Sequence, residues 1–301
     1  MKATAEPITA PAATEKSWLV VFSELVKARL TFLVLITTLV GFYVGASGAL
    51  DWTLMVHTLA GTALLACGAA ALNQLIEREH DAKMRRTECR PLPSGRLTPN
   101  TVLIFGGACS IAGLVYLAAA VNPLTGLLGA ITLVTYVFVY TPLKRVTWLN
   151  TAIGAVPGAL PPLMGWTAAT NELSPAAWCL FGILFFWQIP HFLAIAWMYR
   201  DEYAKAGFVM LPAVDPEGSR TAHYAVSHTL GLLFASLSPV LFGLTGSIYM
   251  YGALIIGLAF LAAAFAFGRR LDVARARQLF FASIIYLPLL LGLMVLDKIR
   301  Y

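Results

Sequence analysis

The sequence predicts an all-α integral membrane protein, a single bundle of nine transmembrane helices with its N-terminus in the cytoplasm and its C-terminus outside. The first observation is composition: of the 301 residues, 59% are hydrophobic and only 12% are charged, and the mean hydropathy is +0.76. Such a chain is too apolar for an ordinary soluble domain. The other two observations are a series of long apolar runs and a one-sided distribution of Lys and Arg.

The apolar runs are long enough to cross a bilayer as helices, which takes about 20 residues each. They are rich in Leu, Ala and Gly and lack the alternating pattern of barrel strands. In chain order, the predicted spans are 30–48, 52–73, 101–121, 124–141, 148–168, 175–198, 228–246, 249–267 and 279–297. A polar N-terminal tail, residues 1–17, precedes one transmembrane domain, residues 18–301.

The basic residues fix the predicted orientation. With a cytoplasmic N-terminus, 19 of the 21 Lys and Arg residues fall on the inside and only Lys298 and Arg300 fall outside. This bias follows the positive-inside rule. The formal charge of +6 is therefore explained by topology, with the lipid bilayer as the partner and no nucleic acid. The longest predicted loops are also cytoplasmic, so we expect the chemistry on that face.

The stretch "NQLIEREHDAKMRRTECRPLPSG", which follows the second span, concentrates acids and bases. If the helix continues past the membrane surface, Asn73, Glu77 and Asp81 lie at i, i+4 and i+8 on one face. Two carboxylates and an amide oxygen, without His or Cys, suit a hard cation such as Mg²⁺ shared with phosphate oxygens. The prolines and glycine of "RPLPSG" should break the helix and fold the loop back.

Basic side chains around this stripe could neutralise phosphate charge directly. They are Arg78, Lys83, Arg85, Arg86 and Arg90. The alternative is a solvated helix end held by ion pairs between neighbouring turns. Topology explains the bases but gives no reason for acids among them, which favours a diphosphate site.

A second cluster follows the sixth span in "WQIPHFLAIAWMYRDEYAKAGFVMLPAVDPEG". Asp201 and Glu202 leave the membrane beside Arg200 and Lys205, and the chain again turns through a Leu-Pro step. The two acidic helix ends hint at a weak internal repeat. Between them, "YTPLKR" places Tyr140, Lys144 and Arg145 at the inner end of the fourth span.

Together with "SHTLGLL", these motifs resemble the heme-farnesylating branch of the UbiA superfamily of intramembrane prenyltransferases, over roughly residues 20–300. The superfamily motif N-x-x-x-D-x-x-x-D appears here with Glu77 as its middle acid, which remains an oxygen ligand. A second D-x-x-x-D would require an acid at Lys205. The resemblance therefore implies Asp201 as a further metal ligand, with Glu202 beside it.

The resemblance implies transfer of a farnesyl group from farnesyl diphosphate to a vinyl group of heme B, which gives heme O. Heme B is then a substrate and Mg²⁺ is the cofactor that bridges the diphosphate. The catalytic set is Asn73, Glu77, Asp81, Lys144 and Asp201. The resemblance also places the protein in a bacterial inner membrane, with hand-over of heme O to an enzyme that modifies it.

The residues support this mechanism in outline, since Lys83, Arg86, Lys144 or Arg145 can accept the charge of the leaving diphosphate. The allylic cation that remains needs a dry cavity lined by aromatic faces. Candidates are Tyr136, Tyr140, Trp187, Phe192 and Trp197, with Tyr199 as a further substrate contact, although aromatic residues near helix ends commonly anchor at the membrane interface.

His191 follows Pro190 inside the sixth span. An intramembrane histidine is a functional candidate by default. It could contact the heme iron or a propionate, or bind a carbonyl group that the proline leaves free.

Two other functions stay open at this point. One is a related prenyltransferase with another aromatic or tetrapyrrole acceptor. The other is a transporter of an anionic substrate, which is disfavoured because the acids gather at one face instead of at paired broken helices in the midplane.

Overall fold

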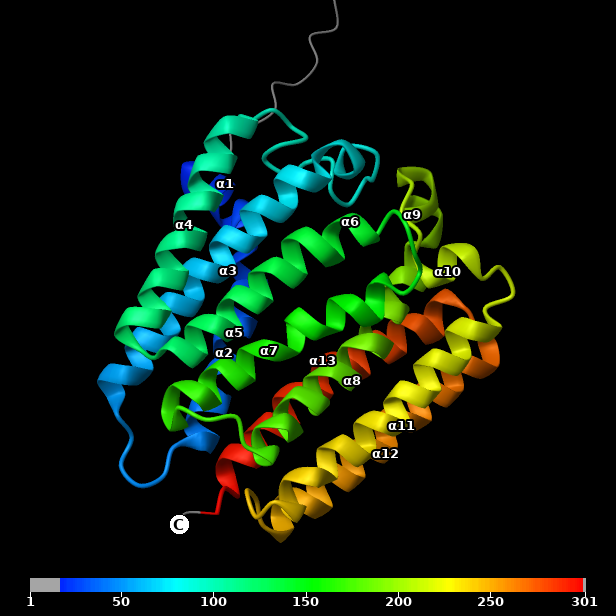
Figure 1. Cartoon of the computed structure of the whole chain (residues 1–301). Helices are drawn as coiled ribbons and strands as arrows, with labels where there is room; N and C mark the ends of the chain where they lie inside the picture. The colour runs from blue at the N-terminus through cyan, green and yellow to red at the C-terminus, as the bar shows by residue number, and fades with distance from the viewer. Residues whose placement is uncertain (1–16, 300–301) are drawn as a thin grey trace, which may run out of the picture.

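The computed structural model describes residues 17–299, and the predicted polar tail therefore lies outside the described residues except for Ser17 (Figure 1). The described chain is built from helices. They are α1 (Trp18–Leu25), α2 (Ala28–Gly45), α3 (Trp52–Asp81), α4 (Pro99–Ala120), α5 (Pro123–Val134), the π-helix η1 (Thr135–Tyr140), α6 (Thr141–Leu143), α7 (Asn150–Thr170), α8 (Pro175–Met198), α9 (Arg200–Ala206), α10 (Leu211–Val214), α11 (Ser219–Leu241), α12 (Ser247–Arg270) and α13 (Val273–Leu296).

Each of the nine predicted spans is occupied by a long helical segment, with α5, η1 and α6 forming one of them. Eight of these segments in the described residues are long and apolar enough to cross a membrane. The remaining one, α7, contains three prolines and three glycines, and more than half of its residues are buried. A helix enclosed by protein needs fewer long apolar side chains than a helix that faces lipid. The all-α membrane fold is confirmed, while the ninth crossing stays a prediction.

Two helices begin earlier than the apolar runs suggest, because polar caps precede those runs. α11 begins at Ser219, where the carboxylate of Asp215 accepts hydrogen bonds from the backbone nitrogen (2.8 Å) and hydroxyl (2.9 Å) of Thr221. α13 begins at Val273, where Asp272 accepts a bond from the backbone nitrogen of Arg275 at 2.7 Å. A window that measures hydropathy cannot detect a capped polar first turn.

The long helices pack mainly on their neighbours in the chain, and contacts between α2 and α13 bring the first and last long helices together. The contact between α2 and α7 is especially close. A β-carbon added at Gly41 would lie 2.0 Å from the carbonyl oxygen of Pro162, and one added at Gly165 would lie 1.9 Å from that of Thr38. Small residues allow such backbone approach in membrane bundles.

The last described residues fasten one end of this bundle. The ammonium of Lys298 donates to the carbonyl oxygens of Tyr43 (2.6 Å) and Ala46 (2.5 Å), where α2 ends. Asp297 accepts from the backbone nitrogen of Tyr249 (2.7 Å) in the first turn of α12. The C-terminal end of α3 lies at the other end of the bundle, together with the helices α6 and α9; this is the upper end in Figure 1.

Candidate functional site

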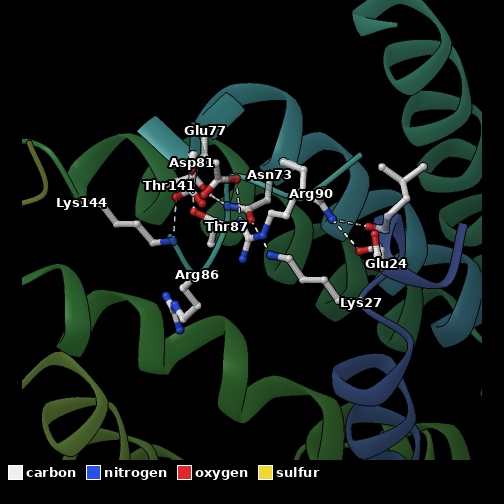
Figure 2. Close-up of polar contacts among 12 residues, drawn as sticks. Glu24, Lys27, Asn73, Glu77, Asp81, Arg86, Thr87, Arg90, Thr141 and Lys144 are labelled. Carbon is white, nitrogen blue, oxygen red and sulfur yellow. Dashed lines mark hydrogen bonds and ion pairs between the residues drawn. The ribbon is translucent and has the colours of Figure 1, made fainter. Parts of the chain in front are cut away.

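A stripe of three oxygen-bearing side chains lies near the end of α3. The predicted continuation of this helix is confirmed, because α3 runs without a break to Asp81. Asn73, Glu77 and Asp81 therefore share one face, with exposed fractions of 0%, 6% and 1% (Figure 2). Burial of two carboxylates requires cationic partners.

Each of the three side chains has a basic partner from a different segment. The ammonium of Lys27 lies 2.6 Å from Oδ1 of Asn73. The ammonium of Lys144 lies 2.7 Å from Oε1 of Glu77. Nη1 of Arg90 lies 2.6 Å from Oδ2 of Asp81. Three oxygens on one helix face are thus each paired with a basic side chain, as Figure 2 shows.

Lys27 is the member of this cluster that sequence reasoning missed, because a base directly before the first span was counted only as a signal of topology. It links α1 to α2 with a left-handed backbone, at φ 48° and ψ 53°, which is unusual for a residue other than glycine. Loss of hydration on burial, helped by the nearby charge of Arg90, lowers the pKa of Lys27 to about 7. The one signal in the sequence that could have identified Lys27 was its position directly before the first predicted span, residues 30–48.

Gln74 holds the turn that presents Lys27. Its Nε2 donates to the carbonyl oxygens of Glu24 and Leu25, both at 2.8 Å, where α1 ends. These carbonyls lack partners within their own helix. One α3 residue therefore caps α1, and its neighbour Asn73 accepts the bond from Lys27.

The π-helix η1 delivers a further partner to Asn73. Pro142 has no backbone N–H, which removes a regular helical hydrogen bond at this point. The hydroxyl of Thr141 donates to the carbonyl oxygen of Tyr136 at 2.8 Å and accepts from Nδ2 of Asn73 at 2.9 Å. Asn73 is therefore oriented at both ends of its amide, and its oxygen faces Lys27. Single π turns are frequent at functional sites.

The loop after α3 returns to the bundle as predicted, but the helix ends earlier than expected. α3 ends at Asp81, ten residues before the first proline of "RPLPSG", Pro91. The hydroxyl of Thr87 donates to the carbonyl oxygen of Asp81 at 2.8 Å, and Arg90 binds its carboxylate. Leu92 and Leu97 then pack beside Val21. Backbone bonds such as that from Met84 to Asp81 (3.3 Å) and the side-chain bonds of Thr87 and Arg90 form this turn before the prolines are reached.

Lys144 connects the cluster with the second half of the bundle. Its ammonium lies 4.6 Å from the ring centroid of Tyr140, and its carbonyl accepts from the backbone nitrogen of Val209 at 2.7 Å. Burial acts to lower the pKa of Lys144, but the charge of Glu77, followed by Tyr140, raises it above its ordinary value. The side chain is therefore a permanent cation beside Glu77.

The other predicted basic residues are placed less uniformly. Nη2 of Arg86 donates to the hydroxyl of Tyr203 at 2.7 Å, and its guanidinium lies 5.4 Å from the ring centroids of Tyr199 and Tyr203. Arg78 turns back to the carbonyl oxygen of Leu75 at 3.0 Å. Four further predicted bases are exposed, namely Lys83, Arg85, Arg145 and Lys205.

Asp201 is not joined to the cluster by any contact among the described residues. Its side chain is 87% exposed and lies 3.8 Å from Nε of Arg200. Within residues 17–299, no group of three or more His, Cys, Asp and Glu side chains is arranged to hold a metal. The metal role of Asp201 stays a prediction. Trp187 and His191 face α13, where Trp187 donates to the carbonyl oxygen of Ser283 at 2.8 Å and His191 lies 2.7 Å from the Ser283 hydroxyl.

An apolar cavity of about 30 Å³ lies along α3 on the membrane side of Asn73. Thr62, Ala66 and Ala69 contribute the α3 wall, at positions that precede Asn73 by one to three turns. Side chains of α2, α5 and α7 complete the lining. A charged site thus adjoins an apolar space that leads into the membrane interior.

Comparison with known proteins gives consistent results. The sequence profile of the UbiA prenyltransferase family matches residues 34–285. A protoheme IX farnesyltransferase of Solibacter usitatus is 47% identical over 286 residues, which cover 92% of this chain and 98% of that protein. A protoheme IX farnesyltransferase of Koribacter versatilis is 42% identical and covers 99% of both chains.

A solved structure also shares the fold. It is a UbiA homolog from Archaeoglobus fulgidus bound to GPP and Mg²⁺, with a TM-score of 0.64. Sequence identity is 16%, and the match covers 91% of this chain and 99% of that one.

Proposed function

Because this chain belongs to the UbiA prenyltransferase family, we propose that the cluster on α3 is its prenyl diphosphate site. The reaction is transfer of the farnesyl group of farnesyl diphosphate to a vinyl group of heme B, which gives heme O. The observation that carries this proposal is the buried stripe of Asn73, Glu77 and Asp81, in which each side chain has a basic partner. Two buried carboxylates and an amide oxygen held in this way can exchange their basic partners for a metal diphosphate.

The donor set fits a hard divalent cation. Asn73, Glu77 and Asp81 offer one amide oxygen and two carboxylates, which is the chemistry Mg²⁺ selects when phosphate oxygens and water complete its shell. These three residues would hold the ion, and Asp201 is proposed as a further ligand. When bound, Mg²⁺ neutralises diphosphate charge and stabilises it as a leaving group. The GPP and Mg²⁺ of the Archaeoglobus fulgidus homolog agree with this assignment.

Basic side chains then bind the diphosphate. Lys27, Lys144 and Arg90 already lie at the three oxygens, so each is within reach of a phosphate group placed there. Their charges grow in importance as the carbon–oxygen bond breaks, because the negative charge of the leaving group increases. Arg86 lies in the loop after α3 and is held by Tyr203 of α9, in the second acidic cluster. We also assign Arg78, Lys83, Arg145 and Lys205 to the surrounding electrostatic field.

Bond breaking leaves an allylic farnesyl cation, which must be kept from water. Tyr136 and Tyr140 lie beside the cluster with ring centroids 5.7 Å apart, and their faces can stabilise positive charge. The apolar cavity below Asn73 is the proposed path of the farnesyl chain, which widens it on binding. Exclusion of water also strengthens every charge interaction in the site.

The carbon–carbon bond forms without a protein nucleophile. The terminal vinyl carbon of heme B attacks C1 of the farnesyl cation, and the positive charge moves to the vinyl carbon attached to the porphyrin. Water adds to that carbon and loses a proton, which leaves a hydroxyethylfarnesyl group. Diphosphate departs with the electron pair of the broken bond, so no oxidant or reductant is needed.

We place this site on the cytoplasmic face of a bacterial inner membrane. The 19 bases on the predicted inside support that orientation. Heme O would pass to an enzyme that modifies it further.

The test is direct. Purified protein is incubated with heme B, farnesyl diphosphate and Mg²⁺, and the product is identified by mass. Heme O together with stoichiometric diphosphate supports the proposal. Farnesylation of hydroxybenzoate in place of heme would indicate the other acceptor class, and transport without diphosphate release would indicate a carrier.

A further inference from the structure

His191 lies inside α8 in a setting that fixes its ring. The imidazole stacks on Trp187 and on Phe280 of α13, with ring centroids 5.0 Å away in each case and interplanar angles of 22° and 30°. Phe192 meets its edge at 5.4 Å. Two stacking partners from different helices leave the ring little freedom to rotate.

The hydrogen bonds around Ser283 determine which ring nitrogen carries the proton. The hydroxyl of Ser283 donates to the carbonyl oxygen of Phe280 at 2.6 Å, and a hydroxyl has one proton to give. The same oxygen lies 2.7 Å from Nδ1 of His191. With its proton given to Phe280, the hydroxyl accepts from an Nδ1–H group. Trp187 binds the carbonyl oxygen of Ser283 at 2.8 Å and holds this turn of α13 in place. A neutral ring with hydrogen on Nδ1 carries its lone pair on Nε2.

Nε2 makes no hydrogen bond to any residue in the range 17–299, and the side chain is only half-buried. The neighbouring Phe192 is 37% exposed, so an apolar aromatic surface adjoins the free nitrogen. A histidine whose Nδ1–H is anchored and whose Nε2 is open has the arrangement of an axial ligand of heme iron. Among the substrates of the proposed reaction, only heme offers an atom that calls for a nitrogen ligand.

We infer that Nε2 of His191 is the axial ligand that holds the iron of heme B, and that Ser283 is the positioning residue that sets its tautomer. This inference rests on the proposed function for the identity of the ligand. His191 precedes the end of α8 by seven residues, about 10 Å along the helix at 1.5 Å per residue.

The test uses tag-free, full-length protein in detergent, titrated with ferric heme B and then reduced. We compare the wild type with His191→Gly, Ser283→Ala and a matched control, His57→Gly. His57 is another intramembrane histidine, and its Nδ1 lies 2.7 Å from the hydroxyl of Tyr116 on α4. Absorption spectra report heme binding, and resonance Raman spectra of the ferrous complex report the iron–histidine stretch.

We expect His191→Gly to lose the iron–histidine stretch and to bind heme at least about tenfold more weakly, because even a change in the outer shell of a metal ligand costs about tenfold in affinity. Free imidazole should restore the ligated spectrum. Ser283→Ala should keep the stretch but shift its frequency, because the Nδ1 hydrogen bond is lost. His57→Gly should match the wild type. If His191→Gly destabilises the fold, the frequency of the iron–histidine stretch in Ser283→Ala decides whether His191 is the ligand.

An unchanged spectrum in His191→Gly, or an unshifted stretch in Ser283→Ala, overturns the assignment even when the wild type makes heme O. Conversely, a wild type that shows the His191-dependent spectrum but makes no farnesylated heme contradicts the proposed function alone. The two failures are therefore separable.

Discussion

The ammonium of Lys27 lies 2.6 Å from the amide oxygen of Asn73, although 46 residues separate them. This bond joins the left-handed turn between α1 and α2 to the first oxygen of the α3 stripe. Lys27 is therefore a member of the site, and its backbone strain is retained for the position that it gives the ammonium.

Substitution of Lys27 should separate strain from function. Lys27→Ala and Lys27→Gly both remove the ammonium, so both should lower turnover and raise the KM for farnesyl diphosphate. Glycine adopts the left-handed turn without the penalty of about 1–2 kcal/mol that other residues carry. The Gly variant should consequently melt at a higher temperature than the Ala variant, as measured by thermal unfolding in detergent. Equal melting temperatures would show that the turn relaxes.

Loss of either carboxylate of the stripe should nearly abolish activity. Glu77→Gln and Asp81→Asn keep the size of each side chain but weaken cation binding. Loss of an outer-shell partner of a metal ligand costs up to about 100-fold, so we expect loss of a direct ligand to lower turnover by more than about 100-fold. Steady-state assays across Mg²⁺ concentrations provide the measurement. Glu79→Gln is the matched control, because Glu79 is 72% exposed and, among residues 17–299, bonds only Arg78 on the same helix. Near-normal activity of Glu77→Gln at saturating Mg²⁺ would count against the site.

Lys144→Ala should raise the KM for farnesyl diphosphate more than the KM for heme B. A cation 2.7 Å from Glu77 can bind phosphate but offers nothing to a vinyl group. Arg277, which is exposed near the start of α13, provides the control, and Arg277→Ala should change both constants little. Equal increases for the two substrates in Lys144→Ala would indicate a role in folding.

The contact between α2 and α7 predicts a stability effect. Gly165→Ala would push a methyl group into the carbonyl oxygen of Thr38, and we expect a loss of about 1–3 kcal/mol in unfolding free energy, as for other overpacked sites. Gly107→Ala in α4 is the control because no neighbouring atom lies within 4 Å of the added carbon. That variant should be neutral or slightly more stable. Denaturant titration in mixed micelles measures both.

The native Cys89 can report the orientation in the membrane. It is exposed in the loop after α3, whereas the other three cysteines are half-buried or buried. An impermeant maleimide should label Cys89 in inside-out vesicles and leave it unlabelled in intact spheroplasts, with Cys89→Ser as the blank. A phosphatase fused after Tyr301 should be active, because it would lie on the side of the membrane away from the cytoplasm. Labelling of Cys89 from the outside would mean that the orientation is reversed.

Parts of this architecture follow from sequence because they depend on local rules. Helical spacing was sufficient to place Asn73, Glu77 and Asp81 on one face, and hydropathy located the long helices. The end of α3 was misplaced because Thr87 and Arg90, which terminate it, act through side-chain bonds to Asp81. Such bonds depend on how a loop folds, and composition does not encode that.

The residues that contact the site from distant parts of the sequence are the second group that was not predicted. Lys27 and Thr141 reach the site from other segments, and Gln74 holds the turn that carries Lys27. Nothing in their local sequence distinguishes these three from ordinary turn or helix residues. The motif resemblance pointed to Asp201 instead, whose side chain is turned to solvent. Spacing along one helix can be calculated from sequence, whereas the approach of a second helix requires the packed bundle.

The bonds from Lys298 to the end of α2 also impose an order on biosynthesis. Ala46 and Lys298 are separated by 252 residues. At a synthesis rate of roughly 5–20 residues per second, the ribosome needs about 10 to 50 seconds to produce the second residue after the first. For that interval α2 is already in the bilayer while the helix that will cover its flank does not yet exist. Lipid, or the insertion machinery, must occupy that flank until α13 arrives and displaces it.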